Sequence, residues 1–231
     1  TAQVSQNCWY LTAKRFFTFL FKTLFPVEII NADLMKRENK PYIVIANHRS
    51  VWDPLILMSV CPEQIRFLVK EELMQRPLLS KLAKKIDVIP VQRHASDIRA
   101  FRDCITALRN QCILGIFPEG TRSEDCRILR FHKGAFYLAE QLQADVVPVF
   151  LHGVGHVLPK RDFMLRQGRI DVEVDRRIAL GDGHFSADLL ERTRQMRHYY
   201  QQHYAEMCRR IETDDYWMPY RRLADYYKVN V

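Results

Sequence analysis

The chain has 231 residues, of which 48% are hydrophobic and 27% are charged, and its formal net charge is +8. This length predicts one large domain rather than two small ones, and the hydrophobic content excludes a largely disordered chain. The excess of 35 basic over 27 acidic residues favours anionic partners. Nucleic acids, phospholipid surfaces and phosphate-bearing substrates all meet that description, and the charge does not choose among them.

The first segment, residues 8–27, is rich in aromatic and aliphatic side chains and is interrupted by Lys14, Arg15 and Lys22. Its uninterrupted apolar run is much shorter than the ~20 residues that a membrane-spanning helix needs. Aromatic bulk flanked by basic residues is typical of a helix that lies in a membrane interface. An ordinary helix packed on the domain is an equal alternative, and the two can both hold. We predict a membrane-interface segment over residues 1–30.

From Pro41 onward, short β-branched runs alternate with longer helical stretches. The short runs predict strands at 42–46, 65–69, 87–91, 113–117, 146–151 and 170–174. The longer stretches predict helices at 54–59, 73–84, 95–109 and 134–142. This alternation favours an α/β fold, in which a mixed, largely parallel sheet is flanked by helices. We assign this domain to residues 31–180.

The C-terminal part, residues 181–231, has a different character. Ser186 is expected to be the N-cap of a long, heavily charged helix from 187 to about 211. The tail that follows, residues 216–222, is aromatic and basic. The sequence leaves open whether this tail docks on the domain, touches a membrane or begins a connector.

The cysteines and histidines do not predict a metal centre or a disulfide framework. The six cysteines form no CxxC pair and have no regular spacing, which favours reduced thiols in a cytosolic setting. His152 and His156 have the spacing of metal ligands, but Gly153 and Gly155 between them indicate a loop, and no second ligand pair stands nearby. We therefore expect no metal.

One candidate catalytic motif follows the predicted strand 42–46, and it reads Asn47-His48-Arg49-Ser50-Val51-Trp52-Asp53. On a continuous helix His48 and Asp53 would point roughly 140° apart, so a catalytic pair needs a turn between them. The Asp53-Pro54 step supports that turn, because it reads as an N-cap followed by proline at the first helical position. In the alternative interpretation, Asp53 only caps a helix and His48 is an ordinary loop residue.

A neutral imidazole is the side chain best suited to take a proton from a hydroxyl at neutral pH. A carboxylate on its other nitrogen would fix the tautomer and stabilise the imidazolium. The sequence contains no GxSxG nucleophile motif beside this pair. The pattern therefore predicts direct attack by an alcohol of the substrate rather than a covalent acyl-enzyme.

A second motif follows the predicted strand 113–117 and reads Phe117-Pro118-Glu119-Gly120-Thr121-Arg122-Ser123. Its backbone N–H groups, hydroxyl and guanidinium together suit a phosphate group. Further cations also fall just after predicted strands, and they are Lys70, Arg93 and Lys133. The alternative interpretation is a simple β-turn with a solvated Arg122.

Several sequence blocks resemble the glycerophospholipid O-acyltransferases, and in particular the lysophosphatidate acyltransferases. The blocks are, in order, Asn47-His48-(four residues)-Asp53, the 117–123 motif and Val147-Pro148-Val149. Residues 69–73, 88–93 and 131–135 are similar to the family's KxEL, FIDR and FKKG segments. The second of these keeps Arg93 but carries Gln92 in place of the acidic residue. The resemblance covers roughly residues 41–174.

The resemblance implies an acyltransferase that moves a fatty acyl chain from acyl-CoA or acyl carrier protein to the free hydroxyl of a lysophospholipid such as lysophosphatidate. In this family pattern His48 is the general base and Asp53 holds it. The residues implied in binding the glycerol phosphate are Arg93, Glu119, Gly120, Thr121 and Arg122. The block Val147-Pro148-Val149 either helps to shape the acyl or acceptor pocket or is a core strand with a proline at its edge. No metal or redox cofactor is implied.

The expected partners are the lysophospholipid, the acyl donor and an anionic membrane surface, with the protein peripheral or monotopic on the cytoplasmic face. A nucleic-acid partner is not expected, because that would need a basic stripe interleaved with aromatics. A non-catalytic lipid-binding or scaffolding module of the same fold remains the alternative function.

Overall fold

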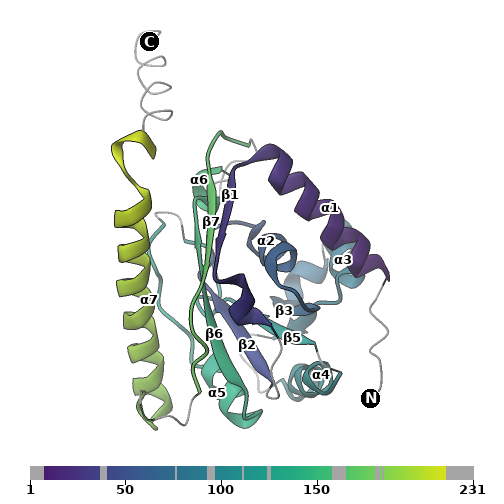
Figure 1. Ribbon diagram of the computed structural model, residues 1–231. Helices are drawn as coiled ribbons and strands as arrows, with labels where there is room; N and C mark the ends of the chain where they lie inside the picture. Colours follow the sequence, from purple (N-terminus) through teal and green to yellow (C-terminus); the bar gives the residue numbers. More distant parts are fainter. Residues whose placement is uncertain are drawn as a thin grey trace.

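The computed structural model describes residues 8–36, 41–75, 77–92, 97–110, 112–123, 126–157, 165–179, 183 and 185–216. At its centre is a seven-stranded sheet in the order β1-β7-β6-β2-β5-β3-β4 (Figure 1). The strands are β1 (Val27–Ile30), β2 (Tyr42–Ala46), β3 (Ile65–Lys70), β4 (Ile89–Val91), β5 (Ile113–Ile116), β6 (Asp145–His152) and β7 (Ile170–Val174). The pairing of β6 with β7 is antiparallel, and the other neighbouring strands pair parallel. The predicted mixed, largely parallel α/β fold is confirmed.

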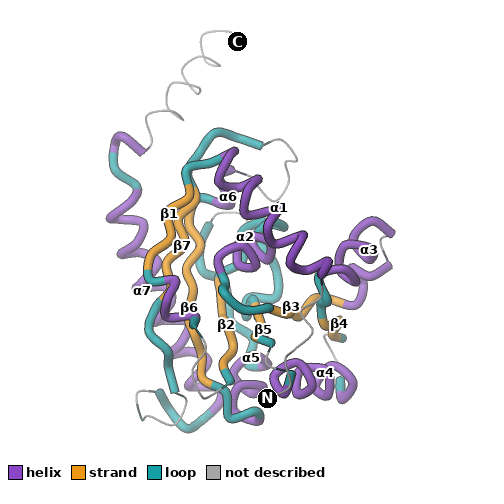
Figure 2. The backbone as a smooth tube through the Cα atoms, turned by 45° about the vertical axis from the view of Figure 1, so that its right-hand side comes forward, coloured by secondary structure: helices purple, strands orange, loops and turns teal. Residues whose placement is uncertain are grey.

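Helices cover both faces of this sheet (Figure 2). They are α1 (Cys8–Leu24), α2 (Asp53–Val60), α3 (Pro77–Lys85), α4 (Ile98–Arg109), α5 (Gly134–Gln141), α6 (Val154–Val157) and α7 (Leu189–Ile211), with 3-10 turns η1 (Ala32–Met35) and η2 (Glu71–Gln75). In the two views α1 and α2 lie on one side of the sheet and α7 lies on the other.

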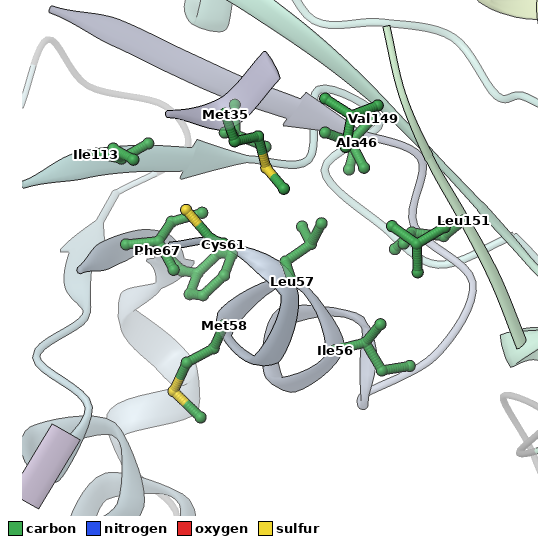
Figure 3. Close-up of a cluster of buried hydrophobic side chains, with 14 of the residues drawn as sticks. Met35, Ala46, Ile56, Leu57, Met58, Cys61, Phe67, Ile113, Val149 and Leu151 are labelled. Carbon is green, nitrogen blue, oxygen red and sulfur yellow. The ribbon is translucent and has the colours of Figure 1, made fainter. Parts of the chain in front are cut away.

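The central strand β2 shows why the sheet is buried on both faces. Successive side chains of a strand point to opposite faces. Val44 and Ala46 accordingly join the core cluster under α1 and α2, part of which Figure 3 shows around Leu57. Ile43 and Ile45 join a second cluster with residues of α4, α5 and α7. Every residue of β2 is buried, as expected for a parallel strand covered by helices on both sides.

Several element boundaries differ from the sequence predictions. Strand β1 was not predicted, and it extends one edge of the sheet by pairing with β7. Helix α7 begins after Asp188, whose carboxylate accepts a hydrogen bond from Glu191 N at 2.8 Å, so Ser186 is not its N-cap. The predicted helix 73–84 is instead the turn η2 followed by α3, which starts at Pro77 because proline fits the first helical position.

Helix α1 combines features of both interpretations of the N-terminal segment. Tyr10 and Phe21 are buried against the domain, and the Tyr10 hydroxyl accepts a hydrogen bond from Ile65 N at 3.0 Å. The packed-helix interpretation is therefore confirmed. Phe19 on the opposite side is 71% exposed, and the membrane-interface interpretation stays a prediction. Among the described residues, no helix combines the length and apolarity needed to cross a bilayer.

Candidate active site

The two sequence motifs meet at one edge of the sheet. Strands β2 and β5 are adjacent and parallel, with Ile45 opposite Ile116, so the loops that follow them start side by side. His48 N donates a hydrogen bond to Glu119 Oε1 at 3.0 Å, and Ser123 N donates one to His48 O at 3.0 Å. The fold therefore brings His48 into contact with the 117–123 turn.

The turn predicted between His48 and Asp53 is present. His48 Nδ1 lies 2.7 Å from Asp53 Oδ2, and the same oxygen accepts hydrogen bonds from Arg49 N at 2.6 Å and Ser50 N at 2.8 Å. Asp53 is fully buried. The structure places Asp53 as the first residue of α2 with Trp52 at the cap position, so the expectation that Asp53 is the N-cap is wrong. Its carboxylate instead folds back to hold the loop.

The His48 ring is fixed on one side and open on the other. It stacks on Phe117 with ring centroids 4.3 Å apart and an interplanar angle of 23°. A carboxylate at Nδ1 favours the tautomer that carries its proton there and leaves the lone pair on Nε2. Nε2 has no hydrogen-bond partner among the described residues, and the side chain is 19% exposed. This geometry suits a general base that accepts a proton at Nε2.

Asn47 has a positioning role that the sequence analysis did not assign. Its side-chain amide donates to Leu151 O at 2.9 Å and accepts from Leu151 N at 2.8 Å. These two bonds prolong the pairing of β2 with β6 by one step and hold the start of the loop that carries His48. The motif Val147-Pro148-Val149 lies within β6, paired with β2, and is part of the core sheet. Strand β6 is not at an edge, because it pairs with β7 on its other side.

The Glu119 carboxylate connects two other parts of the chain by hydrogen bonds. It is only 2% exposed, and its Oε2 accepts a hydrogen bond from Leu129 N at 3.0 Å while Oε1 accepts the one from His48 N. Burial raises the pKa of the Glu119 carboxyl, although the His48 bond and the positive charge of Arg49 oppose that rise. The prediction that Glu119 contacts a substrate phosphate stays a prediction.

The rest of the phosphate motif is more open. Gly120 has φ of +62°, in the left-handed region that favours glycine, and its N–H donates to Phe117 O at 3.0 Å. Thr121 is exposed and Arg122 is half-buried. Arg93 lies outside the described residues. The structure thus brings His48, Asp53 and the 119–122 turn together at one place.

A second cluster of polar side chains lies around His152, the last residue of β6. His152 Nε2 is 2.8 Å from Glu212 Oε1, and Nδ1 is 3.6 Å from Asp171 Oδ2. Burial alone would lower the pKa of His152, but the neighbouring Asp171, Cys208 and Glu212 outweigh burial and raise that pKa to about 10. A pKa raised this far favours the imidazolium form of His152 at neutral pH.

The same cluster contains a set of metal-type donors. Donor atoms of His152, Cys208 and Glu212 lie within 4.8 Å of one another. Two ligands on one tetrahedral zinc ion would be about 3.3 Å apart, given bonds of ~2.0 Å, whereas His152 and Glu212 are 2.8 Å apart. That distance fits a hydrogen-bonded ion pair. The predicted loop at 153–156 is wrong, since His156 belongs to α6 and its Nδ1 lies 3.1 Å from the Tyr216 hydroxyl. The expectation of no metal stays a prediction.

The chain is similar to known acyltransferases. The family model described as Acyltransferase matches residues 27–152, which include His48, Asp53 and the 117–123 turn. A chloroplastic 1-acyl-sn-glycerol-3-phosphate acyltransferase from Arabidopsis thaliana is 26% identical over 172 residues, covering 73% of this chain and 48% of that protein. The human 1-acyl-sn-glycerol-3-phosphate acyltransferase beta is 31% identical over 141 residues, covering 60% of this chain and 51% of that protein. The chain spans about half the length of these curated relatives.

A solved structure has the same architecture. The 1-acyl-sn-glycerophosphate (LPA) acyltransferase PlsC from Thermotoga maritima matches with a TM-score of 0.72 and 23% sequence identity. The match covers 86% of this chain and 79% of that chain. At this identity the likeness concerns the fold. Together with the family model, it confirms the resemblance that the sequence motifs predict.

Proposed function

Since the chain belongs to the acyltransferase family, we propose that it is an O-acyltransferase that acts on a lysophospholipid such as lysophosphatidate. The acyl donor in this proposal is acyl-CoA or acyl carrier protein. The observation that carries the proposal is the His48–Asp53 pair, in which the carboxylate holds Nδ1 at 2.7 Å and Nε2 has no hydrogen-bond partner among the described residues. The position of this pair beside the 117–123 turn links a base to a phosphate-binding motif.

The proposed reaction needs no nucleophile from the protein. His48 Nε2 takes the proton of the acceptor hydroxyl as its oxygen attacks the carbonyl carbon of the thioester. The tetrahedral intermediate collapses, the carbon–sulfur bond breaks, and the His48 imidazolium returns the proton to the leaving thiolate. Asp53 stabilises that imidazolium while it exists. Backbone N–H groups beside the site would stabilise the oxyanion.

The acceptor phosphate is proposed to bind at the 119–122 turn. The left-handed Gly120 shapes the turn, the exposed Thr121 offers a hydroxyl, and Arg122 offers a guanidinium that can bind a phosphate bidentately. Arg93 is proposed to add a second guanidinium. No metal or redox cofactor takes part in the proposed steps.

Attachment to an anionic membrane at its cytoplasmic face is proposed to occur through α1. Trp9, Phe16 and Phe19 are 61%, 57% and 71% exposed, and aromatic side chains beside basic ones favour the membrane interface. Helix α1 also lies next to the catalytic loop, because the rings of Phe21 and Trp52 are 5.2 Å apart. A membrane-bound α1 would therefore place His48 near its lipid substrates.

A panel of lysophospholipids, each offered with acyl-CoA and with acyl carrier protein, tests the proposal. His48→Ala is the blank, and His198→Ala on the exposed face of α7 is the matched control. Transfer above the blank is expected for lysophosphatidate or a related acceptor, while vesicle sedimentation stays unchanged in both variants. If no acceptor is acylated above the blank with either donor, the enzyme proposal fails and the lipid-binding alternative stands.

A further inference from the structure

Arg49 follows His48 directly in the sequence, and its side chain is buried inside the domain. It is only 1% exposed. Its backbone N–H donates to Asp53 Oδ2, and its Nη1 donates to Arg127 O at 2.6 Å. Its guanidinium carbon lies 4.7 Å from the centre of the Tyr204 ring, a distance typical of a cation–π interaction.

The guanidinium is only partly satisfied by hydrogen bonds. Nε and Nη2 of Arg49 are buried and have no hydrogen-bond partner among the described residues. A buried cation is costly unless opposite charge or an aromatic face compensates it. Besides the Tyr204 ring, Glu119 supplies such compensation, because the Arg49 charge opposes the rise in the pKa of that carboxyl. The contacts of Arg49 therefore compensate the cost of burying its charge only in part, which indicates a role other than stabilising the fold.

Arg49 joins three separate parts of the chain. The first is the catalytic loop, the second is the segment after residue 126, and the third is α7, which runs along the opposite side of the sheet from α1 (Figure 1). The space is closely filled, since a Cβ added to Gly155 would lie 3.3 Å from Arg49 Cβ and 3.0 Å from Cys126 Sγ. The backbone at Gly155 therefore packs closely against the first atoms of the Arg49 side chain.

We propose that Arg49 is a positioning residue for acyl transfer, which anchors the His48–Asp53 loop to α7 through the ring of Tyr204. This inference rests on the proposed function. The anchored side chain fixes the backbone of Arg49, whose N–H orients the Asp53 carboxylate and whose preceding residue is the base itself. Tyr204, outside the range matched by the family model, thereby takes part in arranging the active site.

Kinetics of four variants test the proposal on the full chain with the best donor and acceptor from the panel. Arg49→Met is expected to lower kcat by ~100-fold, since a small misplacement of a catalytic group has effects of that order, with KM within about twofold. Tyr204→Leu is expected to lower kcat by ~10-fold. Tyr204→Phe keeps the ring and is expected to stay within about twofold of the wild type.

Arg192→Met is the matched control, because Arg192 is also buried, at 4% exposure, and donates to backbone carbonyls at the start of α7. Its kcat is expected to be unchanged. Equal loss of kcat in Arg49→Met and Arg192→Met, or equal activity of Tyr204→Leu and Tyr204→Phe, would overturn the positioning role. The Tyr204 pair decides the matter if Arg49→Met does not fold.

A spectroscopic measurement separates this inference from the proposed function. The proton on His48 Nδ1 should give a downfield NMR signal in the wild type and in Arg192→Met, and this signal should broaden or disappear in Arg49→Met. An unchanged signal in Arg49→Met contradicts the positioning role, whether or not acyl transfer is detected. Loss of the signal in a chain that transfers no acyl group upholds the anchoring of the His48–Asp53 pair by Arg49 and refutes the proposed function.

Discussion

Two histidines at the ends of neighbouring strands, His48 after β2 and His152 at the end of β6, both face carboxylates. Asp53 binds one nitrogen of His48, the other nitrogen has no hydrogen-bond partner among the described residues, and the side chain is 19% exposed. Carboxylates stand at both nitrogens of His152, which is fully buried and whose pKa is raised to about 10. Both sites thus contain a histidine–carboxylate pair, and they differ in the second nitrogen. In the proposed function this difference makes His48, and not His152, the base.

The largest effect is expected from removing each imidazole in turn. His48→Ala should lower kcat/KM by ~10³-fold or more, because general-base catalysis contributes on that order. His152→Gln should leave kcat/KM within about threefold, because both nitrogens of the buried His152 imidazole face carboxylates. Thiol release from the acyl donor measures both at pH 7. Similar losses of kcat/KM in His48→Ala and His152→Gln would contradict the assignment of His48, and not His152, as the base.

The carboxylates of Asp53 and Asp171 should also differ in their importance for kcat. Asp53→Asn is expected to lower kcat by ~10²-fold or more, since an amide can donate to Nδ1 and favour the wrong imidazole tautomer. Asp171→Asn, which changes the carboxylate beside His152, should alter kcat by less than about threefold. Initial rates at saturating donor and acceptor measure this contrast. A larger loss in Asp171→Asn than in Asp53→Asn contradicts it.

The charge on His152 predicts a pH-dependent stability. Its native pKa, about 10, lies above the unfolded value of ~6.5, so the native state holds the proton more tightly. The stabilisation is fully present below pH ~6.5 and is lost as the pH rises towards 10. The free energy of unfolding of the wild type minus that of His152→Gln should fall by a few kcal/mol at most over this range. Urea unfolding at several pH values measures it, and a constant difference contradicts the charged state.

The smallest effect concerns the turn that stands beside His48. Arg122→Gln should raise KM for lysophosphatidate by ~10-fold with kcat changed less, because a guanidinium binds phosphate more strongly than an amide does. Arg130→Gln, which removes an exposed arginine before α5, is the control. Acceptor titrations at saturating donor give both constants. An unchanged KM in Arg122→Gln would contradict the proposal that Arg122 binds the phosphate.

Much of the fold could be predicted from local patterns. The strand runs after Pro41 were identifiable because β-branched residues cluster between helical stretches. The offset of His48 from Asp53 required a turn, and the structure contains it. Strand β1 was missed because Val27–Ile30 is a short edge strand directly after an aromatic helix.

The supporting contacts of the site could not be predicted in the same way. Asn47 pairs with Leu151, 104 residues later, and His48 N bonds Glu119, 71 residues later. Such contacts depend on which strands become neighbours, and no local pattern reports that. The partner of His152 is likewise 60 residues away, at Glu212.

The central claim is that His48 activates the acceptor's own hydroxyl. The most direct measurement mixes the wild type with a labelled acyl thioester before lysophosphatidate is added, and follows thiol release together with the intact mass of the chain. We predict an unmodified chain and no thiol burst before the acceptor, and then thiol release equal to the phosphatidate formed. A stoichiometric acylated chain, or a burst without acceptor, would contradict the account.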